Sequence, residues 1–257
     1  MSQWTQVCYR YDGGFAGFLT CVFEAYVNHE RPAAFLTQAD PDMTLWPERA
    51  VETDRPHALR VYRSLGERLS PEFRDRVTKG FLTCLPRREL ALWELTAGGY
   101  ARGARILRQL TDPAVARVDA AVRHLENEAH LLKGFVRFSQ LGDALVGEIE
   151  PKNWVLPLLR PHFCARLSGE KFVLHDRTHH EALFYADRSW AIQPVEDFHM
   201  GEPGAEERSF RAMWRRFYDA IAIEGRYNAK CRMTQMPKRY WGTMTEFQRD
   251  DERSALP

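Results

Sequence analysis

The sequence predicts an α+β fold with an N-terminal strand–turn–helix, a helical middle region, an antiparallel sheet and a basic C-terminal helix. The evidence is a short β-prone run that ends in a glycine turn, helical periodicity through residues 54–134, and β-type alternation after Gly134. No internal repeat, low-complexity tract or clear linker divides the chain. We therefore expect a single α+β domain over residues 1–257, in which residues 54–134 could be an inserted helical subdomain.

The chain is predicted to open with a strand, a glycine turn and a helix. Residues 6–11, QVCYRY, are β-prone and run into Asp12-Gly13-Gly14. In the following segment, FAGFLTCVFEAYVNH, apolar residues recur at i, i+3, i+4 and i+7, as on the buried face of a helix. Residues 31–53 are rich in Pro, Asp and Thr, which predicts an irregular connection.

Two dipeptides mark helix starts in the middle region. Ser70-Pro71 and Asp112-Pro113 each place a capping side chain before a proline suited to the first turn. Gly98-Gly99 and Gly103 predict a helix end or a kink.

After Gly134 the pattern predicts a sheet. FVRFSQL and ALVGEIEP form a hairpin around Gly142-Asp143, and KFVLHD, EALFYA and WAIQPV read as three further strands. The intervening segment WVLPLLRPHFCARL contains two prolines and predicts a short or broken helix. AEERSFRAMWRRFYDAIAIE predicts a helix with one apolar side, made of Phe210, Met213, Trp214, Phe217 and Ile221.

The overall composition indicates a globular, cytoplasmic protein. The five cysteines contain no CxxC pair, which favours reduced thiols over a disulfide framework. We find no secretory signal pattern and no apolar stretch of roughly 20 residues that would span a membrane. The formal net charge is only +1, so any basic surface must be local.

Positive charge is concentrated near the C-terminus, where Arg and Lys outnumber Asp and Glu between residues 205 and 241. Cations neutralise phosphates and flat rings stack on bases, so this segment suits a nucleic acid. The candidate nucleic-acid-binding residues are Arg215, Arg226, Asn228, Lys238, Arg239, Tyr240 and Trp241. The alternative is a solvated helix face, with Arg239 paired to Glu246 or Glu150 and the two aromatic rings packed on the domain.

Four stretches of the chain are YDGGFAGFL, GEIEP with the following VLPLLRPHFCARL, FYDAIAIEGRYNAK and MPKRYW. They resemble, in the expected order from about residue 7 to about residue 246, a bacterial family that is associated with DNA metabolism and DNA repair and whose domain has no known function. The resemblance implies a DNA context and two kinds of partner: a radical SAM protein encoded nearby, and a uracil-DNA glycosylase-like domain fused to some members. It implies no catalytic residue. Gly14, Gly225 and Ala229 depart from the family pattern, which puts the shape of the loop near Arg226 in doubt.

Two weaker candidate sites remain. The turn with Gly13, Gly14 and Gly17 offers backbone N–H groups and a helix N-terminus to a phosphate, although a tight turn explains these glycines equally well. A metal could gather ligands from a second set, but its spacing matches no ligand pattern, so we expect neither metal nor cofactor. That set is His162, Cys164, His175, His179 and His180.

Acid–base groups are also present without a distinguishing pattern. Glu148, Glu150, Asp176 and Arg177 fit ordinary strand-face and turn charges. A further set on one predicted helix fits a solvated surface: His124, Glu126, Glu128 and His130.

Three functions follow as hypotheses. The first is a factor of DNA repair or DNA metabolism that binds DNA, or a repair partner on DNA, through the basic helix and the MPKRYW loop. The second is an enzyme that processes bases or hydrolyses nucleic acid with a carboxylate/His site in the β region. The third is a protein-docking module for a radical SAM or glycosylase-like partner.

Overall fold

The computed structural model describes residues 4–41, 44–196, 198, 201, 204–220, 228, 230, 233–234 and 236–247. It divides into two compact units, Met1–Leu125 and Glu126–Pro257. The boundary falls inside the helix α5 (Pro113–Phe135). The predicted helical region 54–134 is therefore distributed over both units, and most of its helices belong with the N-terminal strands in the first unit.

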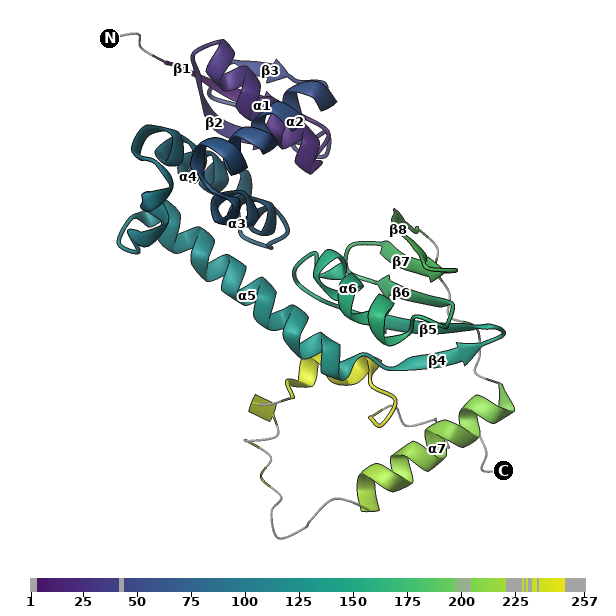
Figure 1. Cartoon of the computed structure of the whole chain (residues 1–257). Coiled ribbons are helices and arrows are strands. Elements are labelled where there is room, and N and C mark those ends of the chain that lie inside the picture. The colour runs from purple at the N-terminus through teal and green to yellow at the C-terminus, as the bar shows by residue number, and fades with distance from the viewer. Residues whose placement is uncertain are drawn as a thin grey trace. The chain divides into compact units, whose positions relative to one another are not determined.

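The first unit contains a parallel three-stranded sheet with the order β2-β1-β3, covered by helices (Figure 1). The predicted strand, glycine turn and helix at its start are confirmed as β1 and α1. The elements of this unit before α5 are β1 (Thr5–Arg10), α1 (Phe15–Val27), β2 (Glu30–Leu36), β3 (Glu48–Ala50), α2 (Arg55–Ser64), the π-helical turn η1 (Leu65–Leu69), α3 (Pro71–Phe81), α4 (Arg88–Arg102) and the 3₁₀ turn η2 (Ala104–Arg108).

The prediction of an irregular connection over residues 31–53 was wrong in part. Residues 31–36 and 48–50 belong to β2 and β3, which pair with the two sides of β1, whereas residues 37–41, 44–47 and 51–53 are irregular as predicted. Pro32 lies on an edge strand and next to a shift in the β1–β2 register, the two places where a sheet tolerates proline. The strands were missed because neither shows a clear period-2 pattern.

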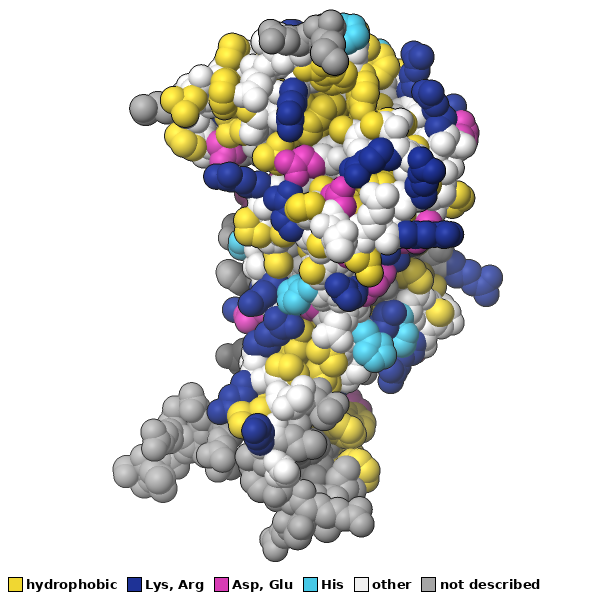
Figure 2. Space-filling model, turned by 90° about the vertical axis from the view of Figure 1, so that its left-hand side faces the viewer, with side chains coloured by type: hydrophobic (Ala, Val, Ile, Leu, Met, Phe, Trp, Pro, Cys, Tyr) yellow, Lys and Arg dark blue, Asp and Glu magenta, His cyan; other side chains and the backbone are white. Residues whose placement is uncertain are grey.

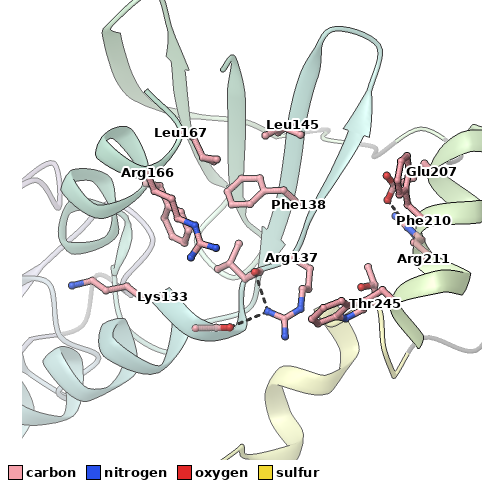
Figure 3. Close-up of a pocket in the computed structure, with 14 residues that line it drawn as sticks. Lys133, Arg137, Phe138, Leu145, Arg166, Leu167, Glu207, Phe210, Arg211 and Thr245 are labelled. Atoms are coloured by element: carbon pink, nitrogen blue, oxygen red, sulfur yellow. Dashed lines mark hydrogen bonds and ion pairs between the residues drawn. The ribbon is translucent and has the colours of Figure 1, made fainter. Parts of the chain in front are cut away.

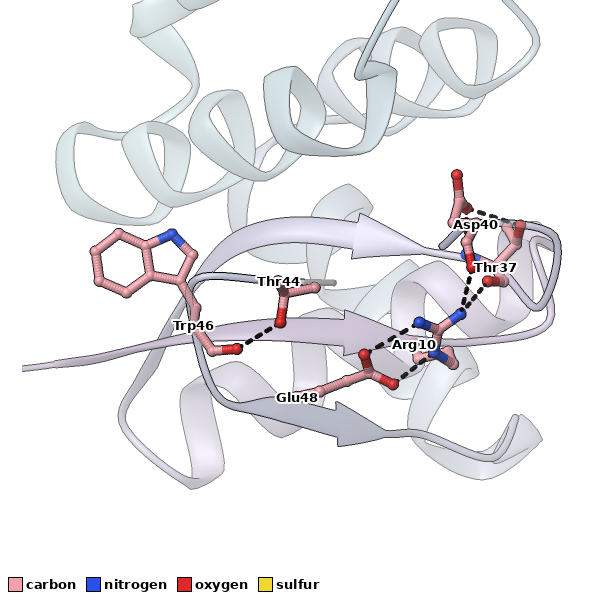
Figure 4. A network of polar contacts seen from close by, with 6 residues as sticks. All are labelled: Arg10, Thr37, Asp40, Thr44, Trp46 and Glu48. Atoms are coloured by element: carbon pink, nitrogen blue, oxygen red, sulfur yellow. Dashed lines mark hydrogen bonds and ion pairs between the residues drawn. The ribbon is translucent and has the colours of Figure 1, made fainter. Parts of the chain in front are cut away.

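Two polar networks tie the three strands together. Inside the sheet, the buried Glu30 accepts hydrogen bonds from the Tyr9 hydroxyl at 2.6 Å and from Arg49 Nη2 at 2.5 Å. At the end of β1, Arg10 donates to Glu48 of β3 at 2.5 Å and to the Thr37 carbonyl after β2 at 2.6 Å (Figure 4). The loop between β2 and β3 is thus anchored to the central strand.

Both predicted helix starts in this unit are confirmed. The Ser70 hydroxyl accepts the Phe73 N–H at 3.0 Å and caps α3, while Asp112 Oδ1 accepts the Ala114 N–H at 3.0 Å at the start of α5.

Gly98-Gly99 does not end a helix, because α4 runs through both residues; the helix ends before Gly103, as that glycine predicted. A Cβ on Gly99 would lie 2.5 Å from the Phe73 ring, so this glycine permits close packing of α4 on α3.

The second unit contains a five-stranded sheet with the order β4-β5-β6-β7-β8, and α6 lies over one of its faces (Figure 1). The predicted hairpin and three further strands are confirmed, but the sheet is mixed rather than antiparallel, because β5 and β6 run parallel. The helix α6 connects these two strands, and such a crossover makes them parallel. The elements are β4 (Phe138–Leu141), β5 (Ala144–Ile149), α6 (Leu156–Arg166), β6 (Phe172–Asp176), β7 (Glu181–Ala186), β8 (Ser189–Pro194), α7 (Ala205–Ala220) and the 3₁₀ turn η4 (Lys238–Thr243).

The predicted C-terminal helix is confirmed as α7, but its described apolar side is not buried. Phe210, Met213, Trp214 and Phe217 are each at least 40% exposed, and Ile221 lies outside the described residues. Across the described part of the chain, every helix is too short or too polar to cross a membrane.

We expect Arg10→Met to release the loop between β2 and β3. The Arg10 hydrogen bond holds the pKa of the Glu48 carboxyl below its ordinary value. Glu48 is therefore charged at neutral pH, and its contribution is lost as the pH falls through that lowered pKa. In hydrogen exchange at pH 7, amides of residues 37–41 and 44–51 should exchange faster in the variant, while those of α3 and α4 should not change.

Arg63→Met is the matched control, because Arg63 makes no ion pair within the described residues. Unchanged exchange in the loop of the Arg10 variant would show that the network does not hold it.

Candidate functional site

The segment around η4, residues 236–247, folds back on its own unit. Tyr240 is buried, its ring lies 5.4 Å from that of Phe135, and Met244 is fully buried. The Trp241 indole donates to the Met236 carbonyl at 3.1 Å and stacks on Phe247. Most of the aromatic surface of this segment is therefore used inside the fold.

A buried carboxylate fixes this segment to α5. Glu128 is 1% exposed and accepts hydrogen bonds from the backbone N–H groups of Lys152 and Asn153 and from Asn153 Nδ2, the last at 2.6 Å. Arg239 Nη2 lies 3.3 Å from Glu128 Oε1 and also donates to the Tyr240 hydroxyl. The prediction that Glu128 belongs to a solvated helix face was wrong, because these donors balance its buried charge.

A second ion pair holds the other end of the segment. Arg137, which precedes β4, donates to both carboxylate oxygens of Glu246 at 2.6 and 3.1 Å, and the Glu246 side chain is 1% exposed. Arg239 therefore pairs with neither of the two expected carboxylates, since Glu150 pairs with Arg177 at 2.9 Å.

These contacts divide the candidate nucleic-acid-binding residues. Arg239 and Tyr240 lie in the Glu128 contact, and Trp241 is half-buried in the segment. Lys238 is exposed, with its ammonium 5.9 Å from the centre of the Trp241 ring. Arg215 is half-buried on α7, Asn228 is exposed, and Arg226 lies outside the described residues. Their contact with nucleic acid stays a prediction.

A groove lies between α7 and the body of the second unit, with a volume of about 510 Å³. We call it the α7 groove. It is lined from α5, the β4–β5 hairpin, α6 and α7, together with Thr245. In Figure 3, Lys133 and Arg166 lie on one side and the α7 residues on the other, with Phe138 between them. The lining residues are Lys133, Gly134, Val136, Arg137, Phe138, Leu145, Phe163, Arg166, Leu167, Glu207, Phe210, Arg211, Trp214 and Thr245.

The α7 side of the groove is attached to the edge strand β4. Arg211 donates to Glu207 at 2.8 Å and to the Ser139 hydroxyl at 2.5 Å, while the Gln140 amide donates to Glu207 at 3.3 Å. Partial burial opposes ionisation of Glu207, but these hydrogen bonds hold the pKa of its carboxyl below its ordinary value. Glu207 and Arg211 therefore neutralise each other.

The opposite side of the groove carries uncompensated positive charge. Within the described residues, Lys133 and Arg166 form no ion pair, whereas Arg137 and Arg211 are paired. Burial and, after it, the charges of Lys133 and Arg166 lower the pKa of the His162 imidazole. The α7 groove thus combines two available cations with the exposed rings of Phe210 and Trp214.

On the face shown in Figure 2, Lys and Arg side chains are spread among hydrophobic ones. The count of charges over residues 205–241 did not locate the groove, because Lys133 and Arg166 lie outside that segment.

The histidines of the second unit have separate partners. His175 Nδ1 lies 3.4 Å from Glu148 Oε1, whereas His179 Nδ1 lies 2.7 Å from Asp176 Oδ2. Cys164 lies on α6 with His162, and His180 is exposed in the turn after β6. Among the residues that the structure describes, no three His, Cys, Asp or Glu side chains are grouped to hold a metal ion.

Asp176 and His179 form an oriented dyad. Asp176 is 1% exposed, and its Oδ1 accepts the N–H groups of Thr178 and His179. Trp154 packs on the imidazole at 4.1 Å between ring centres. Burial, with Asp176 nearby, raises the pKa of the neighbouring Glu181 carboxyl. Sequence reasoning named Asp176 and His179 separately but missed their pairing, because turn geometry decides it.

The glycine turn of the first unit already holds an anionic side chain. Asp12 Oδ1 accepts the Gly14 N–H at 2.9 Å, and Oδ2 accepts the Thr53 hydroxyl. A Cβ on Gly17 would lie 2.2 Å from Asp12 Oδ1, while Gly13 has a φ of +82°. The glycines are thus accounted for by the turn and by the carboxylate that packs there, which repels a phosphate.

We expect Glu128→Gln to loosen residues 236–247. The amide would place an N–H₂ group against donors and would leave Arg239 without a counter-charge, at a cost of about 2–3 kcal/mol to the second unit. The measurement is thermal unfolding combined with hydrogen exchange of residues 236–247. Glu170→Gln is the control, since Glu170 is exposed. Equal protection of the segment in both variants would contradict the proposed anchoring.

A family model described as a domain of unknown function, DUF4130, matches residues 86–246, which is well over half of the chain. No curated protein matches the chain. The matched region contains the α7 groove, the Glu128 contact and the Asp176–His179 dyad. Because the match covers more than half of the sequence, the chain belongs to the DUF4130 family.

Proposed function

We propose that this protein is a factor of DNA metabolism or repair that contacts DNA, or a repair partner bound to DNA, through α7 and the α7 groove. The observation that carries the proposal is that two cations without an ion pair in the described residues, Lys133 and Arg166, line the same groove as the exposed rings of Phe210 and Trp214. Such a surface can neutralise phosphates and stack on bases at the same time. The resemblance of four sequence stretches to a DNA-associated family supports the same context.

The proposal assigns different tasks to the basic residues of the C-terminal region. Arg239 serves the fold through Glu128, and Tyr240 is enclosed beside it. Lys238 and Arg216 are exposed and extend the positive surface. The groove is open and about 510 Å³ in volume, which suits part of a strand rather than a whole duplex.

The protein partners implied by the resemblance would use the same helix. The exposed apolar side of α7, which includes Met213 and Phe217, could meet a radical SAM or glycosylase-like protein while the groove holds DNA.

Removal of the two groove cations tests the DNA contact. In a salt titration of DNA binding by fluorescence anisotropy, Lys133→Ala/Arg166→Ala should reduce the log–log salt slope by about 1.4–1.8, as expected for two lost phosphate contacts. Single- and double-stranded probes should be compared, and we expect the larger loss on single strands.

Lys152→Ala/Arg188→Ala removes the same charge from exposed positions of the same unit and is the matched control. Equal slopes for the two double variants would remove the groove from the DNA contact. If the protein binds no DNA but co-purifies with a partner, and Met213→Glu/Phe217→Glu abolishes this, α7 is a docking surface instead.

An enzyme acting on nucleic acid is the second candidate, and the Asp176–His179 dyad favours it. Because a carboxylate accepts hydrogen bonds, Asp176 favours the tautomer with the proton on His179 Nδ1, in which Nε2 carries the lone pair that a general base requires. His179 could then take a proton from a water molecule that attacks a phosphodiester or a glycosidic carbon.

The role of His179 as a general base can be tested separately. With labelled oligonucleotides as substrate, His179→Gln should abolish strand cleavage or base release, a loss of about 100-fold or more for a general base. His180→Gln, in the adjacent exposed position, should retain it. Activity that survives His179→Gln would exclude the dyad as the catalytic base.

A further inference from the structure

The first unit contains a pocket that the proposed function does not use. Its volume is about 700 Å³, within the roughly 300–1,000 Å³ typical of small-molecule sites. The pocket is lined from the start of the chain, the end of α1, β2, one side of α4 and the segment that leads into α5. We call it the aromatic pocket.

Four aromatic residues form its walls: Trp4, Tyr26, Trp93 and Tyr100. The Tyr26 ring lies 5.5 Å from each of the other three rings, measured between centres, so the four form one cluster. Trp4 remains 38% exposed. Between these walls α4 contributes the small residues Ala97, Gly98 and Ala101, together with the charged side chains of Glu94 and Arg102.

Three polar groups of this cluster are without a partner among the described residues. The Tyr26 hydroxyl and the indole N–H groups of Trp4 and Trp93 make no hydrogen bond to any residue that the structure describes. Trp4 is the most accessible of the three residues, whereas Trp93 is only 4% exposed. Burial raises the pKa of Tyr26 to about 12, so its hydroxyl is protonated at neutral pH and can donate. By contrast, the Tyr100 hydroxyl donates to Ser64 at 3.0 Å.

The charges around the aromatic pocket leave one cation uncompensated. Asp112 pairs with Arg102 at 2.8 Å, and Glu94 pairs with Arg117. Arg31, exposed on the edge strand β2, has no ion pair within the described residues. A cationic ligand would meet this guanidinium with no available carboxylate, whereas an anionic ligand would be attracted. The aromatic walls favour a flat ligand, and the unpaired charge of Arg31 favours one that carries an anion.

We propose that the aromatic pocket binds a nucleotide, with the base against the indole rings and the phosphate at Arg31. Stacking on an indole face tolerates any base, and the three unpartnered donors can meet base or sugar acceptors. The guanidinium supplies a charge-assisted, bidentate contact to the phosphate. This inference goes beyond the proposed function and does not rest on it, because none of its residues belongs to the α7 groove.

The test is calorimetric titration of the full chain with nucleoside 5′-monophosphates, with adenosine and ribose 5-phosphate as partial ligands. The nucleotide should bind more tightly than either partial ligand. Arg31→Gln should weaken nucleotide binding by about tenfold or more and leave adenosine binding unchanged.

Ala101→Trp should abolish binding of all three ligands by filling the pocket from an exposed position of α4. Arg63→Gln, an exposed and unpaired arginine of α2, should change nothing. The melting temperature of each variant shows whether it is folded.

A second arm separates a free nucleotide from one at the end of a strand. In the Lys133→Ala/Arg166→Ala background, a 5′-phosphorylated oligonucleotide that still binds and is displaced by the mononucleotide identifies a strand end as a ligand. Binding of the mononucleotide without binding of the oligonucleotide identifies the free nucleotide as the ligand. Binding that Ala101→Trp does not affect, or preference for a quaternary ammonium ion over the nucleotide, would overturn the proposal.

Discussion

The C-terminal segment of this protein depends on one buried carboxylate. Glu128 belongs to α5, and its donors come from the loop after β5 and from η4. A carboxylate that is 1% exposed is costly unless every lone pair is met, and here backbone amides, an asparagine and a guanidinium meet them. The MPKRYW stretch therefore has a structural reason to contain Arg239 and Tyr240, independent of any ligand.

This requirement separates two kinds of cation that look alike in the sequence. Arg137, Arg211 and Arg239 neutralise carboxylates within their own unit. Lys133 and Arg166 come from two different helices and meet no carboxylate in the described part of the chain. A polyanion binds most favourably to cations that have no ion pair, because no ion pair within the protein has to break. The α7 groove follows from this difference rather than from the density of basic residues.

The sequence was most informative where a local rule decides the structure. The Ser70 and Asp112 caps, the Gly142-Asp143 hairpin and the amphipathic helices depend on a few adjacent residues, and they were predicted correctly. Reasoning failed where distant segments decide. The parallel pairing of β5 and β6, the strands within residues 31–53 and the role of Gly99 all require knowledge of what lies opposite. Glu128 was misplaced for the same reason, since its donors lie more than twenty residues away.

The packing of α4 against β2 affects how the family region can be handled. The family match begins at residue 86, just before α4, whereas the sheet and the helices α1 to α3 that enclose one side of α4 precede it. A fragment trimmed to residues 86–246 would place Leu92 and Leu95, both fully buried in the intact chain, in contact with water. Such a fragment would tend to aggregate, and it would lack Trp4, Tyr26 and Arg31. In this chain the residues before 86 therefore cover the buried face of α4, with which the family segment begins.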